Sequence, residues 1–288
     1  MITKTLISAE RKLPVFYHVD SKGNLSYNKN TSKGSYYIEH PIDDIHIRIQ
    51  KHGNTKTGDE WLLNTLPGEN PILVQGQPIT NMKGSCLGIC DGCEPFCYAI
   101  HGCQQHHNSV MPSVIKNSSL YRHDKKRFMK EIINELANWR TKNNTEKVFR
   151  WHSSGEIENY NYLEMMMLIA IMFPSIHFYT YTKKFKLVEK YLDKHGDFPA
   201  NFIMNLSVWE DNLIKSGFNL KYLSKVQCFE WKDTISVQEY NHSIHCKSVV
   251  HLVEGEKKGH LDHSHNCKEC GLCWEGKCKG RTILVMNH

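Results

Sequence analysis

The chain has 288 residues, of which 40% are hydrophobic and 23% charged, and its formal net charge is +6 with the 18 histidines counted as neutral. This composition is typical of a globular protein and excludes a disordered chain. The most apolar stretch, residues 165–173, has about half the length that crosses a bilayer, and the N-terminus lacks a signal-peptide core. We therefore expect an intracellular protein, whose clustered cysteines bind metal or do redox chemistry rather than form disulfides.

The first part of the chain, residues 1–80, is predicted to be β-rich. Residues 21–24 have the composition of a turn, and the segment 51–80, rich in Gly, Asn, Thr and Pro, is predicted as loop. The alternation of apolar residues predicts short strands at residues 14–19, 25–27, 36–38 and 45–49.

From about residue 122 the pattern changes to helices alternating with strands. Asn161, followed by Glu164, resembles a capping box at a helix start, and Gly196 is a typical helix stop. The periodicity predicts helices at 128–139, 161–173 and 185–192, and strands at 147–152, 176–182, 202–208, 226–231 and 248–253.

Strands that alternate with helices of this length indicate βαβ units and a parallel sheet. We expect an α/β fold, a full or partial TIM-like (β/α) barrel, with a doubly wound sheet as the alternative. The expected domains are a β-rich N-terminal region at 1–80, a barrel-like core with the first cysteine cluster at 81–253, and a small separate Cys-rich tail at 254–288.

Polar residues stand where the predicted strands end, and active sites of parallel sheets lie at the carboxyl ends of strands. These residues make Ser154, Gly155, Glu156, Lys183 and Asn205 the candidate cofactor-binding residues. Lys183 would bind a phosphate or carboxylate, although a surface lysine is the simpler interpretation. His152, in the same segment as Glu156, is either an acid–base group or an ordinary strand-end histidine.

The first cysteine cluster contains Cys86, Cys90, Cys93 and Cys97 in one short loop. Three thiolates in a compact turn suit a [4Fe–4S] cluster, and zinc held by all four is the alternative. The Cys-x3-Cys-x2-Cys spacing resembles that of the radical SAM superfamily, in which the cluster also binds S-adenosylmethionine. The aromatic residue that usually precedes the last cysteine precedes Cys97 here, so the ligand trio stays open.

Ser154-Gly155-Glu156 also resembles a radical SAM segment, the Gly-Gly-Glu at the end of the second strand that contacts the methionine amine of the cofactor. The alternative is an ordinary turn with a glutamate near a helix start.

The second cluster consists of Cys267, Cys270 and Cys273 at ferredoxin-type spacing, which favours a second [4Fe–4S] cluster over zinc. A fourth ligand is needed. We favour Cys246, upstream of a predicted strand, over the nearer Cys278. The lone Cys228 is predicted to be a buried strand residue.

Four segments together resemble a family of phage proteins, the gene-product-88 family, whose function is poorly defined. They are the cysteine loop ending at Ala99, the strand ends at Arg150–Glu156 and Phe178–Lys183, and Cys267–Trp274 with the terminal His288. The resemblance implies a phage or prophage origin and the cytoplasm of a bacterial host. It implies no reaction, and it does not cover residues 1–80.

Our leading hypothesis is a radical-SAM-like iron–sulfur enzyme that cleaves S-adenosylmethionine reductively at the first cluster and abstracts hydrogen from an unidentified substrate. The C-terminal cluster would be auxiliary, and a flavodoxin- or ferredoxin-like protein would supply electrons. The rival hypothesis is a metal-stabilised nucleic-acid-binding protein of phage replication or host takeover, in which both cysteine sets are structural. The positive charge and aromatic residues such as Tyr36, Tyr37 and Trp61 would then engage phosphates and bases.

Overall fold

The chain divides into two compact units in the computed structural model. Unit 1 comprises Met1–Arg48 with Asn64–Asn138, and unit 2 comprises Ile49–Leu63 with Trp139–His288. The structure describes residues 12–19, 25–26, 35–41, 45–51, 60–69, 73–74, 77–78, 83–88, 93, 97–101, 110–140, 147–209, 212–232, 243–246, 249–250, 260–261 and 267–286.

Unit 1 contains a three-stranded antiparallel sheet in the order β2-β1-β3, in agreement with the predicted β-rich N-terminal region. The central strand pairs with β3 from Lys12↔Pro41 to His18↔Ser35. The strands of this unit are β1 (Lys12–Val19), β2 (Leu25–Ser26), β3 (Ser35–Pro41), β6 (Leu73–Val74) and β7 (Gln77–Pro78). Its helices are α1 (Tyr98–His101), α2 (Val110–His123) and α3 (Lys125–Arg140).

Helix α3 matches the helix predicted over 128–139. Phe128, Ile132 and Leu136 recur every four residues and are fully buried. The Asp124 side chain accepts a hydrogen bond from the Arg127 amide at 2.9 Å, which caps the helix start. Apolar periodicity and a capping side chain are both readable in the sequence, which is why this helix could be predicted.

Helix α2 was not predicted because its buried face is partly polar. Asn117 and Ser118 are fully buried. The Asn117 amide accepts from the Arg48 backbone N–H at 2.7 Å and donates to the Arg48 carbonyl at 2.9 Å, and Ser118 Oγ accepts from the Leu66 amide at 2.8 Å. These side chains replace the backbone partners that a neighbouring strand would offer.

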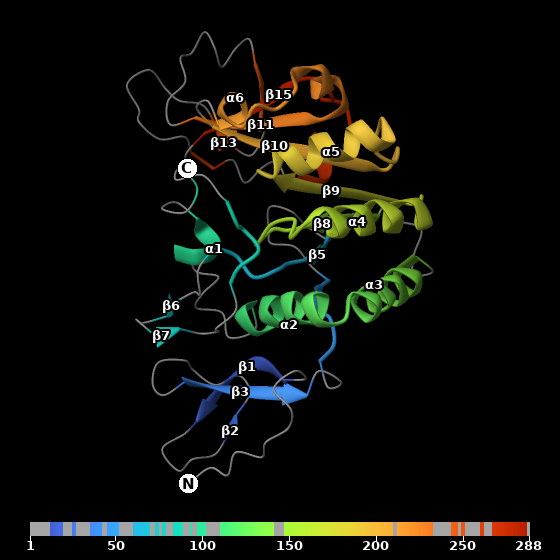
Figure 1. Ribbon diagram of the computed structural model, residues 1–288. Helices are drawn as coiled ribbons and strands as arrows, with labels where there is room; N and C mark the ends of the chain where they lie inside the picture. Colours follow the sequence, from blue (N-terminus) through green and yellow to red (C-terminus); the bar gives the residue numbers. More distant parts are fainter. Residues whose placement is uncertain are drawn as a thin grey trace. The chain divides into compact units, whose positions relative to one another are not determined.

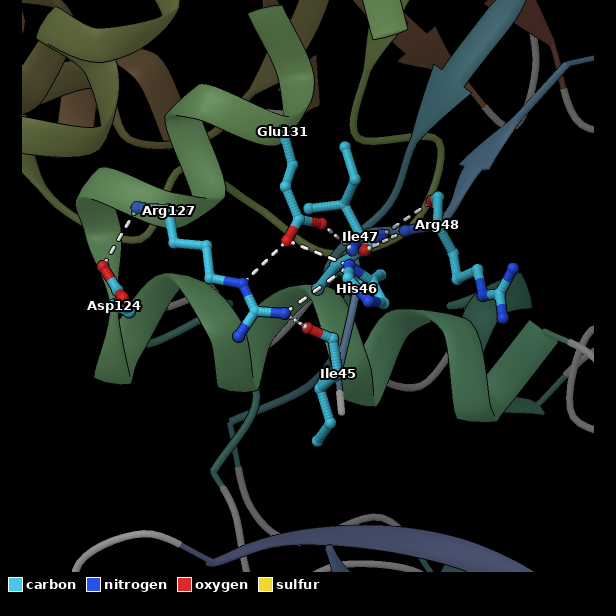
Figure 2. A network of polar contacts seen from close by, with 8 residues as sticks. Ile45, His46, Ile47, Arg48, Asp124, Arg127 and Glu131 are labelled. Atoms are coloured by element: carbon cyan, nitrogen blue, oxygen red, sulfur yellow. Dashed lines mark hydrogen bonds and ion pairs between the residues drawn. The ribbon is translucent and has the colours of Figure 1, made fainter. Parts of the chain in front are cut away.

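The segment 45–48 is held in the same way by α3 (Figure 2). Glu131 accepts a hydrogen bond from the Ile47 amide at 2.9 Å, and Arg127 donates to the Ile45 carbonyl at 2.6 Å. Arg127 also pairs with Glu131 at 2.8 Å, so each charged group fixes the other. The strand predicted at 45–49 is therefore irregular over 45–48, and regular pairing begins only at β4 (Ile49–Gln50).

Among the described residues, unit 2 contains one eight-stranded sheet in the order β12-β15-β11-β10-β9-β8-β5-β4. All neighbours are parallel except β4 and β5, so the fold is mixed α/β. From β5 to β11 the spatial order follows the chain order. The remaining strands are β5 (Trp61–Leu63), β8 (Lys147–Trp151), β9 (Ile176–Thr182), β10 (Phe202–Trp209), β11 (Gln227–Lys232), β12 (Ile244–His245) and β15 (Thr282–Met286).

Strand β5 lies inside the segment 51–80 that was predicted as loop. All three of its residues are buried, and Trp61 stacks on Trp139 with ring centroids 4.1 Å apart. A run of three apolar residues is too short to show a period. Pairing with β8 joins residues 88 positions apart in sequence, such as Trp61 and Phe149, and local pattern does not carry such a tertiary contact.

Helices α4 (Tyr160–Met172) and α5 (Phe185–His195) run beside the parallel strands in Figure 1. The cap of α4 is Asn159, whose side chain accepts from the Tyr162 amide at 3.1 Å, and not the predicted Asn161. Gly196 ends α5 with φ of 79°, as predicted. Shorter elements are α6 (Asn212–Lys215) and the 3₁₀ helix η5 (Leu220–Lys225). None of the described helices is long and apolar enough to cross a membrane.

The C-terminal region differs most from the prediction of a separate tail. After the short helix α8 (Cys267–Cys270), strand β15 enters the main sheet between β11 and β12. Of the strand predicted at 248–253, the structure describes β13 (Val249–Val250), which pairs with β14 (His260–Leu261) outside that sheet. The chain thus returns to the sheet after the cysteines, and β15 fixes the C-terminal end of the cysteine segment.

Candidate metal centre

The segment 267–280 lies against one face of the unit 2 sheet. Trp274 is buried in a cluster with Val148, Tyr179 and Ile203, and Cys267 and Cys273 pack against this cluster. The Trp274 and Tyr179 rings are 5.7 Å apart. We call this side of the strands the cysteine face. Besides the cluster, it carries residues that lie in register with it or two positions along the same strand, namely Arg150, Tyr181, Asn205, Gln227 and Phe229.

Two buried amides fasten the cysteine segment to the sheet. Gln227 donates to Asn205 Oδ1 at 2.9 Å and to the Leu272 carbonyl at 3.1 Å, and it accepts from the Cys278 amide at 3.1 Å. Asn205 donates to the Cys273 carbonyl at 3.1 Å. Since both side chains are fully buried, these bonds are the means by which the segment backbone is satisfied there.

A tight turn brings the three C-terminal cysteines together. Gly271 follows α8 with φ of +66°, and its amide donates to the Cys267 carbonyl at 2.9 Å. A Cβ at this position would lie 2.3 Å from the Glu275 carboxyl group. The left-handed conformation favours glycine at position 271, and a larger residue there would have to displace the flexible Glu275 side chain.

Four thiols from two segments share this region. Burial, together with the neighbouring thiols of Cys246, Cys267 and Cys270, raises the pKa of Cys273 to about 12, and the Tyr181 hydroxyl acts in the opposite direction. Cys246 follows β12, and its amide donates to the Leu284 carbonyl at 2.9 Å. We call these four residues the C-terminal thiol set. Sequence reasoning proposed this combination, and the structure brings its members into one neighbourhood.

Cys278, the other candidate for a fourth ligand, is buried, and its raised pKa is caused by that burial and by nearby Cys270. Cys228 lies on β11, where burial raises its pKa to about 11. None of the described cysteines forms a disulfide.

Within the described part of the chain, no three Cys, His, Asp or Glu side chains are spaced as metal ligands. The donor chemistry of the C-terminal thiol set is that of a thiophilic centre, because four half-buried thiols lie on two neighbouring segments. A bound metal lowers the pKa of each thiol that coordinates it. It also draws its ligands together, because metal binding is coupled to folding of the site.

The first cysteine loop belongs to unit 1, and its two ends are placed. Cys86 donates its amide to the Gly68 carbonyl at 3.0 Å, and Cys97 accepts from the Ile100 amide at 3.0 Å at the start of α1. Gly84 is required beside this strand-like contact, because a Cβ there would lie 2.0 Å from the Gly68 oxygen. Cys93 is half-buried, and Cys90 lies outside the described residues.

The predicted cofactor-binding strand end is a buried hydrogen-bonded turn. Glu156 Oε1 accepts from the Ile157 amide and the Thr182 hydroxyl, both at 2.7 Å, and Oε2 accepts from the Lys183 amide at 2.8 Å. Ser154 is buried and Gly155 has φ of 85°. The carboxylate therefore ties the ends of β8 and β9 together, and cofactor binding by this segment stays a prediction.

His152 occupies a strained position just before that turn. Among the described residues, it is the non-glycine residue whose φ is positive, at 56°. Its buried ring lies beside Tyr162, with 3.2 Å between His152 Nε2 and the Tyr162 hydroxyl. Burial, and secondarily the Arg150 charge, lower the pKa of His152 to about 3. The imidazole is consequently neutral at physiological pH. A side chain with so low a pKa is a weak base and accepts a proton only from a strong acid.

Sequence reasoning missed the roles of Gln227, Tyr181 and Arg150. Each alternates with apolar neighbours on a strand, which places it on one face of the sheet, but alternation does not say what covers that face. Lys183, a predicted anion ligand, has its ammonium 5.3 Å from the Trp209 ring centroid.

A model of the family described as Gene product 88 matches residues 48–276, well over half of the chain. No curated protein and no solved structure matches the chain significantly. The chain belongs to the Gene product 88 family.

Proposed function

We propose that the chain is an iron–sulfur protein and that Cys246, Cys267, Cys270 and Cys273 hold a [4Fe–4S] cluster. The observation that carries the proposal is that Cys267 and Cys273 pack against one buried cluster of the sheet, on a segment that Asn205 and Gln227 fasten there. Ferredoxin-type spacing of Cys267, Cys270 and Cys273 favours iron–sulfur over zinc. When bound, the cluster would supply one-electron chemistry, and the chain would hold it on the sheet through Asn205 and Gln227.

The surroundings of these thiols support a redox site. Trp274, Tyr179 and Tyr181 cover the side of the segment that faces the sheet, so a bound group would have an apolar wall on that side. Low solvent exposure and hydrogen bonds to sulfur are the main protein controls on cluster potential.

The test is anaerobic isolation followed by iron, acid-labile sulfide and zinc analysis. We expect iron and sulfide in equal amounts, and Cys273→Ala should lose a cluster's worth of both. Cys228→Ala is the matched control, because this buried thiol of the same unit lies outside the thiol set. A colourless protein with stoichiometric zinc and no sulfide would sink the proposal in favour of a structural metal site, as the nucleic-acid-binding hypothesis requires.

The enzymatic part of the proposal is reductive cleavage of S-adenosylmethionine at a second cluster held by cysteines among Cys86, Cys90, Cys93 and Cys97. Two features support it. The loop follows the first parallel strand in chain order, and the strands from β5 to β11 are arranged sequentially, as in a full or partial (β/α) barrel and unlike a doubly wound sheet with its reversal of strand order.

Incubation of the cluster-replete protein with S-adenosylmethionine and dithionite tests this activity. We expect 5′-deoxyadenosine and methionine, and their loss in Cys93→Ala with the C-terminal iron retained. If the wild-type protein forms neither product, the enzymatic assignment is wrong. The proposal of a C-terminal cluster would not be affected by that result.

A further inference from the structure

One exposed ridge of α3 carries ammonium and carboxamide groups and no carboxylate. Lys126, Lys130, Asn134 and Asn138 follow one another at four-residue spacing, and all four are exposed. Residues at this spacing lie one above the other on a helix, and the interval of 12 positions between the first and the last spans about 18 Å. We call these four residues the α3 ridge. The opposite face of the helix is the buried apolar one.

The carboxylates of α3 do not neutralise this ridge. Glu131 is turned toward the segment 45–48, where it pairs with Arg127 at 2.8 Å and accepts a hydrogen bond from the Ile47 amide at 2.9 Å (Figure 2). Glu135 is half-buried. Since the charges of Arg127 and Glu131 offset each other, the lysines dominate the electrostatic potential on the exposed side of the helix.

The position of these lysines is not explained by the stability of the helix. The first turn of α3 contains Lys125, Lys126 and Arg127 and no acidic residue. The N-terminal end of a helix is the positive end of its dipole, so acidic side chains are favourable there and cations are not. The capping Asp124 offsets one of these charges and Glu131 another. Acidic residues would give equal solubility at lower cost to the helix, whereas an anionic partner requires cations.

The chemistry of the ridge selects double-stranded DNA as the partner. A helix that binds a membrane surface buries an apolar face in it, but the apolar face of α3 lies inside the protein, and no large hydrophobic side chain is exposed among its described residues. Ammonium groups contact phosphate oxygens, and carboxamides bind phosphate and sugar. A straight, rigid array of such groups matches a duplex, which carries a negative charge about every 1.7 Å along its axis.

We infer that the α3 ridge docks on the sugar–phosphate backbone of double-stranded DNA, with its lysines on phosphates and its asparagines donating hydrogen bonds beside them. The contact reads no base sequence. It is made within unit 1 and does not depend on whether the cysteines hold iron. Trp61, which the rival hypothesis assigns to contacts with bases, is buried against Trp139 and takes no part.

The test is fluorescence anisotropy of a labelled duplex of about 30 base pairs, titrated with the full-length protein between about 50 and 200 mM salt. Each phosphate contact adds about 0.9 to the slope of log affinity against log salt, so the double variant Lys126→Gln, Lys130→Gln should lower this slope by about 2. Glutamine has similar helix propensity to lysine. Asn134→Ala should weaken binding about three- to tenfold at an unchanged slope, because the lost hydrogen bond is neutral.

The matched control is the double variant Lys190→Gln, Lys215→Gln, which removes two exposed helix lysines of unit 2 and changes the net charge equally. It should bind as the wild type does. Lys126→Glu separates binding from folding, since it should weaken binding more than Lys126→Gln without lowering the urea midpoint.

Three results would overturn the inference: no binding of the duplex at about 50 mM salt, an unchanged slope in the ridge variant, or an equal change in the control. Binding to phosphatidylserine vesicles in place of the duplex would assign the ridge to a membrane and overturn it as well. The metal and sulfide content of the same samples tests the proposed function separately.

Discussion

The two cysteine sets look alike in sequence but differ in how the protein supports them. The C-terminal thiol set rests on a sheet face, where Asn205 and Gln227 bind the backbone of its segment and Tyr181 packs against the same buried cluster as Cys267 and Cys273. In the first loop, the described contacts include backbone hydrogen bonds at Cys86 and Cys97 and, just before Cys86, bonds from the Arg122 guanidinium to the Lys83 and Gly84 carbonyls. Cysteine spacing in the sequence indicates which metal a loop would bind. The side chains that hold the loop in the folded protein indicate whether its ligands are already in position before the metal binds.

The same comparison explains why Asn205 had a different predicted role. From the sequence, this polar residue near a strand end is predicted to contact a cofactor. Its amide in fact donates to the carbonyls of Thr180 and Cys273 and accepts from Gln227. Burying such an amide is costly unless it is bonded, so its value lies in holding the segment that carries the thiols.

The sharpest way to break the comparison is to remove one thiol from each set. Cys93→Ala and Cys273→Ala should each lose one cluster's worth of iron, and the double variant should lose nearly all of it. Metal and sulfide analysis of anaerobic protein measures this. Unchanged iron in Cys93→Ala would show that only the C-terminal set is a site.

Gln227→Leu tests whether the sheet preorganises the C-terminal thiol set. The change leaves the Leu272 carbonyl, the Cys278 amide and Asn205 Oδ1 without this partner. Each buried polar group left unsatisfied costs about 1–3 kcal/mol of unfolding free energy. Urea unfolding should show the loss, and cluster content should fall with it. Retention of both would mean that the anchoring amides are dispensable.

His152 predicts a pH dependence confined to unit 2. Its folded pKa, about 3, lies below the unfolded value of 6.5, so the unfolded chain binds the extra proton between these limits. Stability therefore falls as pH drops below 6.5, with a slope of up to about 1.4 kcal/mol per pH unit from this group. His152→Asn, which tolerates a positive φ, should flatten that part of the profile.

Parallel urea titrations of wild-type and His152→Asn protein between pH 7 and pH 4 isolate this contribution, because other titrating groups are common to both. Identical profiles would show that the histidine is not buried as a neutral ring.

The smallest effect is expected for Gly271→Ala. The left-handed conformation costs an alanine about 1–2 kcal/mol, and the new Cβ must displace the flexible Glu275 side chain. Unfolding free energy should fall by that amount while iron content stays nearly unchanged. Gly88→Ala, which has a positive φ of 69° in the first loop and open space around it, is the matched variant. A much larger loss in Gly271→Ala would show that this turn also sets thiol geometry.

The sequence by itself determined the repeating part of unit 2 and the candidate thiols. The strand at 176–182 and the helix ending at Gly196 were predictable because alternation, 3.6-residue periodicity and glycine stops are local properties. The pairing of Cys246 with the Cys267–Cys273 run was also proposed from spacing and the need for a fourth ligand.

Tertiary structure decided what local pattern does not encode. The three-residue strand β5, the polar-faced helix α2 and the late strand β15 are stabilised by partners far away in the sequence. Whether Asn205, Gln227 and Tyr181 bind a ligand or a segment of the same chain depends on what covers the cysteine face. That cover is the cysteine segment, and it lies there because the chain returns to the sheet through β15. Once covered, the polar groups of the strand face must form hydrogen bonds with the segment, because buried polar groups are rarely left unpaired.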